Sequence, residues 1–184
     1  MNGSLDLNTS PTSSPENSFV RLKHSGSSNK KYNPEVRMNK QQNTNLVKKL
    51  FDEVFTKGNI ALMDQLFTND VKMHDPAAPN LKGGLAALKE KENMYKKAFP
   101  NKQLKIEELL ATEDNRVVVL WSCQGVQKGE FQGLPSSGKN FRISGISIYT
   151  FKNDKISDIH QNWDRFGLLE QLGAIEEPTR ALHK

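Results

Sequence analysis

Residues 139–163 read KNFRISGISIYTFKNDKISDIHQNW and contain two runs in which apolar and polar side chains alternate. Alternation with a period of two is typical of β-strands that bury one face. The residues between the two runs, Lys152, Asn153 and Asp154, are frequent in turns. The pattern therefore predicts a hairpin with strands at residues 139–151 and 155–163.

The same alternation precedes this hairpin. It indicates a strand at residues 103–112, a turn at 113–115 and a second strand at 116–131. A loop rich in Gly, Pro and Ser at 133–138 joins these strands to the hairpin. We therefore expect four consecutive strands to form an antiparallel sheet.

The region before the strands has the spacing of helices. Apolar residues recur at intervals of three and four over residues 44–58, with Thr44 as a candidate N-cap and Gly58 as the end. Two further helices are predicted at 60–67 and 83–99, a short strand at 71–74 and a last helical turn at 166–172. Helices followed by an antiparallel sheet define an α+β fold, and a curved sheet covered by helices on one side favours a pocket between them.

Composition divides the chain into three parts. Residues 1–43 are rich in Ser, Asn, Thr and Pro and poor in large apolar side chains, which predicts a disordered low-complexity N-terminal tail. Residues 44–175 have the composition of a globular domain, and residues 176–184 form a predicted C-terminal tail. We expect a cytoplasmic protein, with organelle targeting by the Ser-rich N-terminal tail as the open alternative.

Charge and hydropathy argue against two classes of partner. The net charge is +5, but residues 44–184 carry 20 basic and 18 acidic side chains and no cluster of one sign. We therefore expect no nucleic-acid partner. No apolar run approaches 18 residues, so we expect no membrane partner.

Six short segments, in their order and spacing, resemble the SnoaL-like polyketide cyclase family over residues 45–173. They are VKMHDP at 71–76, AFP at 98–100, GEFQGLP at 129–135, SGK at 137–139, DKI at 154–156 and LLEQLG at 168–173. The resemblance implies a nuclear-transport-factor-2-like cone, with three N-terminal helices packed on a curved antiparallel sheet.

The resemblance also implies an activity. Enzymes of this family close a polyketide ring by an intramolecular aldol step, with an acidic side chain as acid/base and without metal or cofactor. We therefore expect a cofactor-independent cyclase or isomerase that acts on a small hydrophobic carbonyl compound. A non-catalytic small-molecule-binding or dimerisation module of the same fold is the alternative, and a protein-binding domain is a weaker one.

Two residues are candidates for catalysis. The resemblance aligns Asp164 with the acidic residue of the family at the end of the last strand. The alternative for Asp164 is an N-cap on the following helix, because Asp is a favoured capping residue. His74, at the end of a short strand, is a candidate because a neutral imidazole accepts or donates a proton near pH 7. A structural histidine is the alternative there.

Further polar residues are candidates for ligand binding. Strict alternation along residues 155–163 places Asp158 and His160 on the face that carries Ile156, either in a pocket or on a solvated edge. Gln127 stands where many relatives have a histidine, and an amide binds a carbonyl oxygen but shuttles no proton.

The remaining expectations concern apolar residues and metals. Apolar pocket walls are assigned to Trp121, Phe131, Phe141 and Trp163. The single cysteine, Cys123, is interpreted as a small core residue. No metal site is expected, because the histidines at 24, 74, 160 and 183 show no metal-ligand spacing. A homodimer is expected if Ile146, Ile148, Ile159 and Trp163 form an exposed patch on the open face of the sheet.

Overall fold

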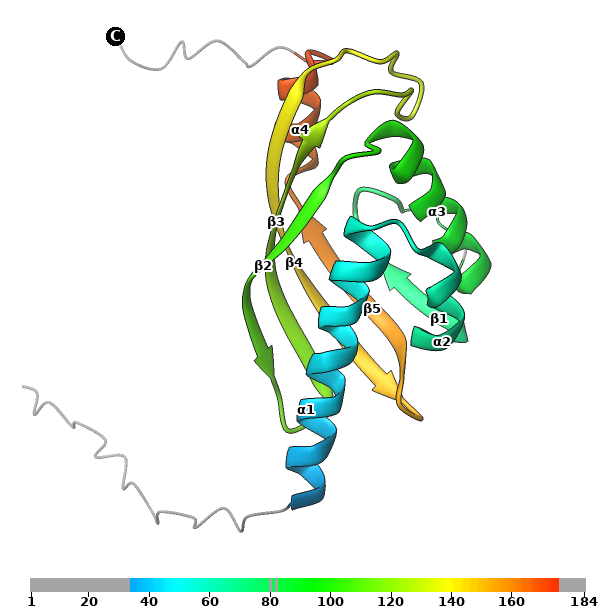
Figure 1. Cartoon of the computed structure of the whole chain (residues 1–184), viewed down its shortest axis with the longest axis vertical. Helices are drawn as coiled ribbons and strands as arrows, with labels where there is room; N and C mark the ends of the chain where they lie inside the picture. Colours follow the sequence, from blue (N-terminus) through cyan, green and yellow to red (C-terminus); the bar gives the residue numbers. More distant parts are fainter. Residues whose placement is uncertain (1–33, 80, 82, 176–184) are drawn as a thin grey trace, which may run out of the picture. The chain divides into compact units, whose positions relative to one another are not determined.

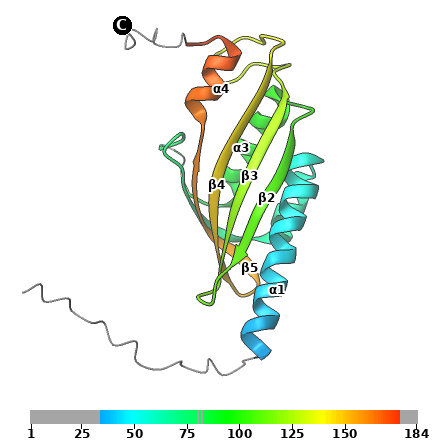
Figure 2. The same cartoon turned by 90° about the vertical axis from the view of Figure 1, so that its left-hand side faces the viewer.

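A five-stranded curved sheet carries helices on its concave side (Figure 1), and Figure 2 shows its outer face with α3 behind it. The computed structural model describes residues 34–79, 81 and 83–175, with side chains from residue 39 onward. The helical segments are α1 (Pro34–Lys49), the π-helix η1 (Leu50–Thr56), the 3-10 turn η2 (Ile60–Leu62), α2 (Met63–Leu66), α3 (Leu85–Ala98) and α4 (Arg165–Leu172). The strands are β1 (Phe67–His74), β2 (Gln103–Ala111), β3 (Arg116–Val126), β4 (Asn140–Lys152) and β5 (Lys155–Trp163). The α+β class and the curved sheet are as predicted.

The sheet differs from the prediction in one pairing. Its strand order is β1-β5-β4-β3-β2, and β2 to β5 form the predicted antiparallel meander. The first strand, however, pairs with β5 in parallel, with His74 opposite His160. The two strands come from distant parts of the sequence, and alternation within each strand carries no information about its partner. The sheet is therefore mixed at its β1 edge.

Turn chemistry explains the central hairpin. Asn153 and Asp154 have φ angles of 50° and 59°. Two successive residues with positive φ make the turn whose twist matches that of the flanking strands, and Asn and Asp tolerate this conformation better than most residues. The strand boundaries at this turn accordingly agree with the predicted ones within one residue.

The first helix begins ten residues earlier than the sequence predicted. Composition predicts a disordered tail up to residue 43, but α1 begins at Pro34. Asn43 is buried and donates a 2.7 Å hydrogen bond through Nδ2 to Oδ1 of Asn115, in the turn between β2 and β3. This contact with a distant turn helps to fix a segment whose own composition is polar. Residues 1–33 of the predicted tail, and the predicted tail at 176–184, lie outside the described residues.

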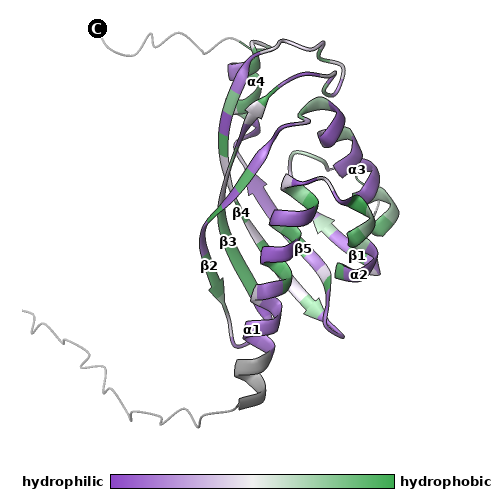
Figure 3. Cartoon of the chain, in the orientation of Figure 1, coloured by the Kyte–Doolittle hydropathy of each residue, from purple (hydrophilic) through white to green (hydrophobic). Residues whose placement is uncertain are grey.

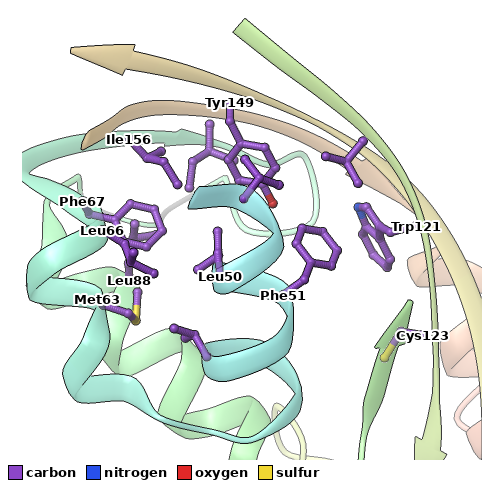
Figure 4. Packing of buried hydrophobic residues seen from close by; sticks show 14 of the residues in the cluster. Leu50, Phe51, Met63, Leu66, Phe67, Leu88, Trp121, Cys123, Tyr149 and Ile156 are labelled. Atoms are coloured by element: carbon purple, nitrogen blue, oxygen red, sulfur yellow. The ribbon is translucent and has the colours of Figure 1, made fainter. Parts of the chain in front are cut away.

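The apolar core lies between the sheet and the helices. Figure 3 shows hydrophobic residues on the strands and on the helices, and the buried ones include Val119 of β3, Ile143 of β4 and Leu50 of η1. Leu50 and Phe51 of η1 pack toward Tyr149 of β4, with the rings of Phe51 and Tyr149 6.4 Å apart (Figure 4). None of the described helices is both long and apolar enough to span a membrane.

The contact of Asn43 yields a stability prediction. Asn43→Ala removes the donor for Asn115, so we expect the free energy of unfolding to fall by about 1–3 kcal/mol. Gln42→Ala is the matched control, because Gln42 is an exposed neighbour on the same helix and should change stability by less than about 0.5 kcal/mol. Urea denaturation measures both. Equal stabilities of the two variants would show that this part of α1 does not depend on the contact.

Candidate functional site

A cavity opens between the concave face of the sheet and the helices η1 and α3. The empty space in and in front of it, open solvent at its mouth included, is about 620 Å³. Its walls are mainly aromatic, from Phe51, Phe99, Trp121, Phe141, Tyr149 and Trp163. Phe51, Trp121 and Tyr149 face one another across the core in Figure 4. Such a lining favours a ligand with a substantial apolar surface.

Gly145 sets the position of the two tryptophans. It is opposite Trp121 on β3 and opposite Trp163 on β5. A Cβ atom at Gly145 would lie 2.4 Å from Cζ2 of Trp121 and 2.8 Å from Cβ of Trp163. Only a residue without a side chain allows both indoles to approach the strand here. The shape of this wall therefore depends on one glycine.

The first polar group at the site is a buried ion pair. The carboxylate of Asp75, directly after β1, lies 3.0 Å from Nζ of Lys91 on α3, and the two side chains are 1% and 7% exposed. Oδ2 of Asp75 also accepts hydrogen bonds from Nε2 of Gln161 at 3.2 Å and from Nε1 of Trp163 at 3.4 Å. Lys91, Gln161 and Trp163 line the cavity, whereas Asp75 lies behind them. The carboxylate thus orients three side chains of the cavity wall.

A second ion pair lies in the cavity wall itself. Oε2 of Glu92 is 3.2 Å from Nζ of Lys102, with side-chain exposures of 14% and 12%. Tyr95 lies between the two ion pairs, with its ring centre 5.7 Å from Nζ of Lys91 and 5.2 Å from Nζ of Lys102. Ammonium groups at such distances are attracted to an aromatic face. Two cations, one carboxylate and one phenol therefore meet in an apolar cavity.

Burial controls the protonation of three neutral groups here. Desolvation raises the pKa of Tyr95 far above its usual value, and it does the same for Tyr149 of the opposite wall. Both phenols therefore remain protonated near neutral pH. Burial also raises the pKa of Cys123 to about 11, so it remains a thiol, in agreement with its interpretation as a core residue.

This arrangement is suited to carbonyl chemistry. The ammonium groups and the Tyr95 phenol can stabilise negative charge on an oxygen, and low dielectric surroundings strengthen such interactions. The Glu92 carboxylate can accept a proton from a bound ligand. The opposite wall adds Ser147, which is buried and accepts a 2.9 Å hydrogen bond from Nε1 of Trp121.

The structure brings three of the four predicted wall residues into the cavity. Trp121, Phe141 and Trp163 line it. Phe131 is fully buried but packs behind the wall, with its ring 5.0 Å from that of Phe99 and 5.6 Å from that of Tyr95. It supports the wall without belonging to it.

Gln127 has a structural role in a loop. Its side chain is fully buried, and Nε2 donates to the carbonyl oxygens of Gly129 and Pro135, both at 3.1 Å. Oε1 accepts hydrogen bonds from the backbone N–H and the hydroxyl of Ser137. The expectation that Gln127 binds a ligand does not fit this position, because its amide is used within the loop of residues 129–137.

A bulge in β5 corrects the expected faces of that strand. Phe151 is opposite Ile156 and Thr150 is opposite Asp158, so Ser157 is the extra residue. Ile156 consequently shares the inner face with Ile159 and Gln161, and Asp158 and His160 point outward. His74 joins them on the outer face, within 3.3 Å of Asp158. Of the two positions expected for Asp158 and His160, the structure shows the solvated edge, and His74, the second candidate for catalysis, does not line the cavity either.

Asp164 adopts the capping position. Its side chain is exposed, and Oδ1 accepts a 2.7 Å hydrogen bond from the backbone N–H of Gly167 in the first turn of α4. It is absent from the described residues that line the cavity. The expectation of a desolvated catalytic carboxylate at Asp164 does not match this geometry.

The polar groups of the cavity were missed by the sequence analysis. Lys91, Glu92 and Tyr95 follow Leu85 and Leu88 at helical spacing, so a charged pair interrupts the apolar stripe of α3. That interruption was a usable signal, because charged residues are rarely buried without a partner. Lys102 and Gln161 gave no comparable signal in sequence.

Comparisons with known proteins agree with this architecture. A family model described as SnoaL-like polyketide cyclase matches residues 45–172. No curated protein sequence matches the chain. Among solved structures, a candidate polyketide cyclase from Acidithiobacillus ferrooxidans is 28% identical, with a TM-score of 0.65 over 72% of this chain and 95% of that one.

Two more solved structures show the same fold at lower identity. A candidate SnoaL-like polyketide cyclase from Jannaschia sp. CCS1 is 20% identical, with a TM-score of 0.67 over 73% of this chain and 94% of that one. TsrD from Streptomyces laurentii is 20% identical, with a TM-score of 0.63 over 76% and 98% of the two chains.

The cap at Asp164 yields a second prediction. Asp164→Ala should lower the free energy of unfolding by about 1 kcal/mol, whereas Asp164→Asn should leave it nearly unchanged because Asn is an equally good cap. Thermal and urea unfolding of both variants measure this difference. A role for the carboxylate beyond capping would instead appear as a functional loss in Asp164→Asn at unchanged stability.

Proposed function

We propose that this chain, which belongs to the SnoaL-like polyketide cyclase family, binds a small hydrophobic carbonyl compound in the cavity and rearranges it by acid/base chemistry. The observation that carries this proposal is the pair of lysine–carboxylate contacts, Lys91–Asp75 and Lys102–Glu92, at an otherwise aromatic cavity. Aromatic walls take up the carbon skeleton of the ligand, and the ammonium groups bind its oxygens. The proposed reaction uses only side chains of this protein and no cofactor.

Glu92 is the best-placed base. It lines the cavity, and its carboxylate is mostly shielded from solvent beside Lys102. In the proposed reaction, Glu92 removes a proton from a carbon next to a carbonyl group, and the electron pair moves onto the carbonyl oxygen. An ammonium group and the Tyr95 phenol stabilise the resulting enolate. The enolate carbon then attacks a second carbonyl carbon of the same ligand, and the new alkoxide takes the proton back from Glu92.

Asp75 has a supporting role in this proposal. Its carboxylate contacts Lys91, Gln161 and Trp163, and Asp75 does not itself line the cavity. A buried ammonium group needs such a partner to remain charged. Asp75 is therefore a positioning residue that keeps Lys91 directed at the ligand.

The ion pair of Glu92 also favours the non-catalytic alternative. The Glu92 carboxylate already accepts a hydrogen bond from Nζ of Lys102, so in the structure it serves as a partner of a lysine. A binding module would use the same lysines to hold the ligand oxygens and would transform nothing. Kinetics with a suitable Glu92 variant separates the two functions.

Both tryptophans of the chain line the cavity, which provides a direct assay for ligands. Hydrophobic polyketones and keto esters that bind should change the intrinsic fluorescence. With a ligand that is converted, Glu92→Gln should lower the rate by about 10²–10⁴-fold and retain binding, because Gln keeps the shape but accepts no proton. Glu90→Gln, at an exposed position of α3, is the matched control and should be unaffected.

Two outcomes contradict parts of this proposal. Turnover that is equal in Glu92→Gln and in the unsubstituted chain would exclude Glu92 as the base. A fluorescence change with no turnover of any ligand that binds would favour the binding module.

We further propose a homodimer formed through the outer face of the sheet. Leu120 and Ile146 are directly opposite each other on β3 and β4, and they are 42% and 48% exposed. Val118 and Ile148 form the next pair, and Leu110 of β2 extends the patch. The expected contributions of Ile159 and Trp163 are wrong, because Ile159 is in the core and Trp163 lines the cavity. Contiguous apolar patches of this kind are typical of interfaces.

Light scattering at micromolar concentration should therefore give twice the mass of one chain. Ile146→Lys should shift the protein to the monomer, because it places a charge at the centre of the patch. Phe166→Lys replaces an exposed apolar residue on α4 and should leave the dimer intact. A monomeric mass for the unsubstituted chain would exclude this interface.

A further inference from the structure

Two histidines meet on the outer face of the sheet, where β1 and β5 run side by side. His74 and His160 are directly opposite each other in the parallel pairing. Their rings stack with centres 4.1 Å apart and planes inclined by 13°. Both side chains are accessible, with exposures of 50% and 59%. The pairing therefore presents two imidazoles to solvent at nearly the same place.

The carboxylate of Asp158 completes the cluster. Oδ2 lies 3.3 Å from Nε2 of His74, and Oδ1 lies 3.1 Å from Nε2 of His160. Despite this short distance, Oδ1 is a buried oxygen that accepts no hydrogen bond of acceptable geometry from the described part of the chain. Buried polar atoms normally have a hydrogen-bond partner, so this oxygen still has lone pairs with which it can bind a metal ion.

The spacing of the three donors fits a single metal ion. One ligand atom from each residue lies within 4.8 Å of the other two. Two ligands about 2.1 Å from a tetrahedral zinc ion are separated by about 3.4 Å. The measured nitrogen–oxygen distances of 3.1 and 3.3 Å are close to that value. The two distances end on different oxygens of Asp158, and the rings are stacked nearly parallel, so binding requires the imidazoles to turn out of the stack until both ring planes point at the ion.

The donor types select among metals. Two imidazoles and one carboxylate suit zinc and other late first-row divalent ions, whereas Mg²⁺ and Ca²⁺ prefer oxygen ligands alone. His74 and His160 also line a surface groove, together with Pro79 and Ile146. The groove leaves room for water or another ligand at a fourth position.

We propose that His74, Asp158 and His160 form a binding site for a divalent transition-metal ion of the zinc class. The site lies on the outer face of the sheet, so it does not depend on the chemistry proposed for the cavity. It borders the proposed dimer interface, because His160 is opposite Ile148. Sequence spacing could not reveal it, because 84 positions separate His74 from Asp158.

Titration of the full chain tests the proposal. After treatment with a chelator, the chain should bind one Zn²⁺ in isothermal calorimetry, and Co²⁺ should give visible absorption bands at the same stoichiometry. At a hundredfold excess of Zn²⁺ over its Kd, the thermal midpoint should rise by about 5–11 °C, and Mg²⁺ should leave it unchanged. Absence of zinc binding by the unsubstituted chain overturns the proposal.

Substitutions test whether these three residues bind the ion. His74→Ala, His160→Ala and Asp158→Asn should each weaken zinc binding by at least about tenfold, since each removes a ligand. Lys72→Gln is the matched control, because Lys72 lies two residues before His74 on the same strand and is exposed. It should bind zinc at least as well as the unsubstituted chain. Unchanged affinity in both histidine variants places the ion elsewhere and overturns the proposal.

A protection experiment needs no variant, so it remains decisive if a substitution prevents folding. Diethyl pyrocarbonate acylates accessible imidazoles, and peptide mass spectrometry locates the products. Zinc should protect His74 and His160 and leave the extent of reaction of His24 and His183 unchanged. Protection of neither His74 nor His160, or equal protection of all four histidines, contradicts the proposed site.

Discussion

The buried carboxylate of Asp75 is the constraint on which the arrangement of this domain depends. It follows β1 directly, pairs with Lys91 of α3 and accepts hydrogen bonds from Gln161 and Trp163 of β5. One side chain therefore joins the edge strand, the helix that covers the cavity and the strand that forms its wall. Removing one partner of such a buried pair typically costs about 3–5 kcal/mol, because the other charge stays buried alone. The same contacts that hold the layers together fix Lys91, Gln161 and Trp163 in the cavity wall.

Most of the fold could be predicted where local chemistry determines it. The meander from β2 to β5 follows from alternation and from turn residues such as Asn153, whose φ of 50° few side chains tolerate. The parallel partner of β1 could not be predicted, because the sequence of a strand does not indicate which distant strand it pairs with. The start of α1 was missed for a similar reason. Its first turns are polar, and Asn43 finds its partner 72 residues away.

The candidate site, like the fold, could be predicted from the sequence only in part. Its aromatic walls could be expected from strand alternation and from the resemblance to a family, but its polar groups could not. The bulge at Ser157 moves Ile156 to the inner face and turns Asp158 and His160 outward. A single extra residue thus exchanged the faces on which the strand prediction rested. On α3, the charged pair Lys91 and Glu92 interrupts an apolar stripe, and its burial becomes understandable only once Asp75 and Lys102 are seen beside it.

The parallel pairing of β1 with β5 also bears on how the chain reaches its native state. The hairpins of the meander join neighbouring segments, so their closure costs little chain entropy. β1 can instead pair only after β5, the last strand to be synthesised, is present. Contacts between residues so far apart in the sequence slow folding. We expect β1, and with it the buried carboxylate that follows, to dock late, onto a meander that is already formed. Until then the edge of β5 is open to pairing with another chain, which makes this strand the point where incomplete folding would lead to aggregation.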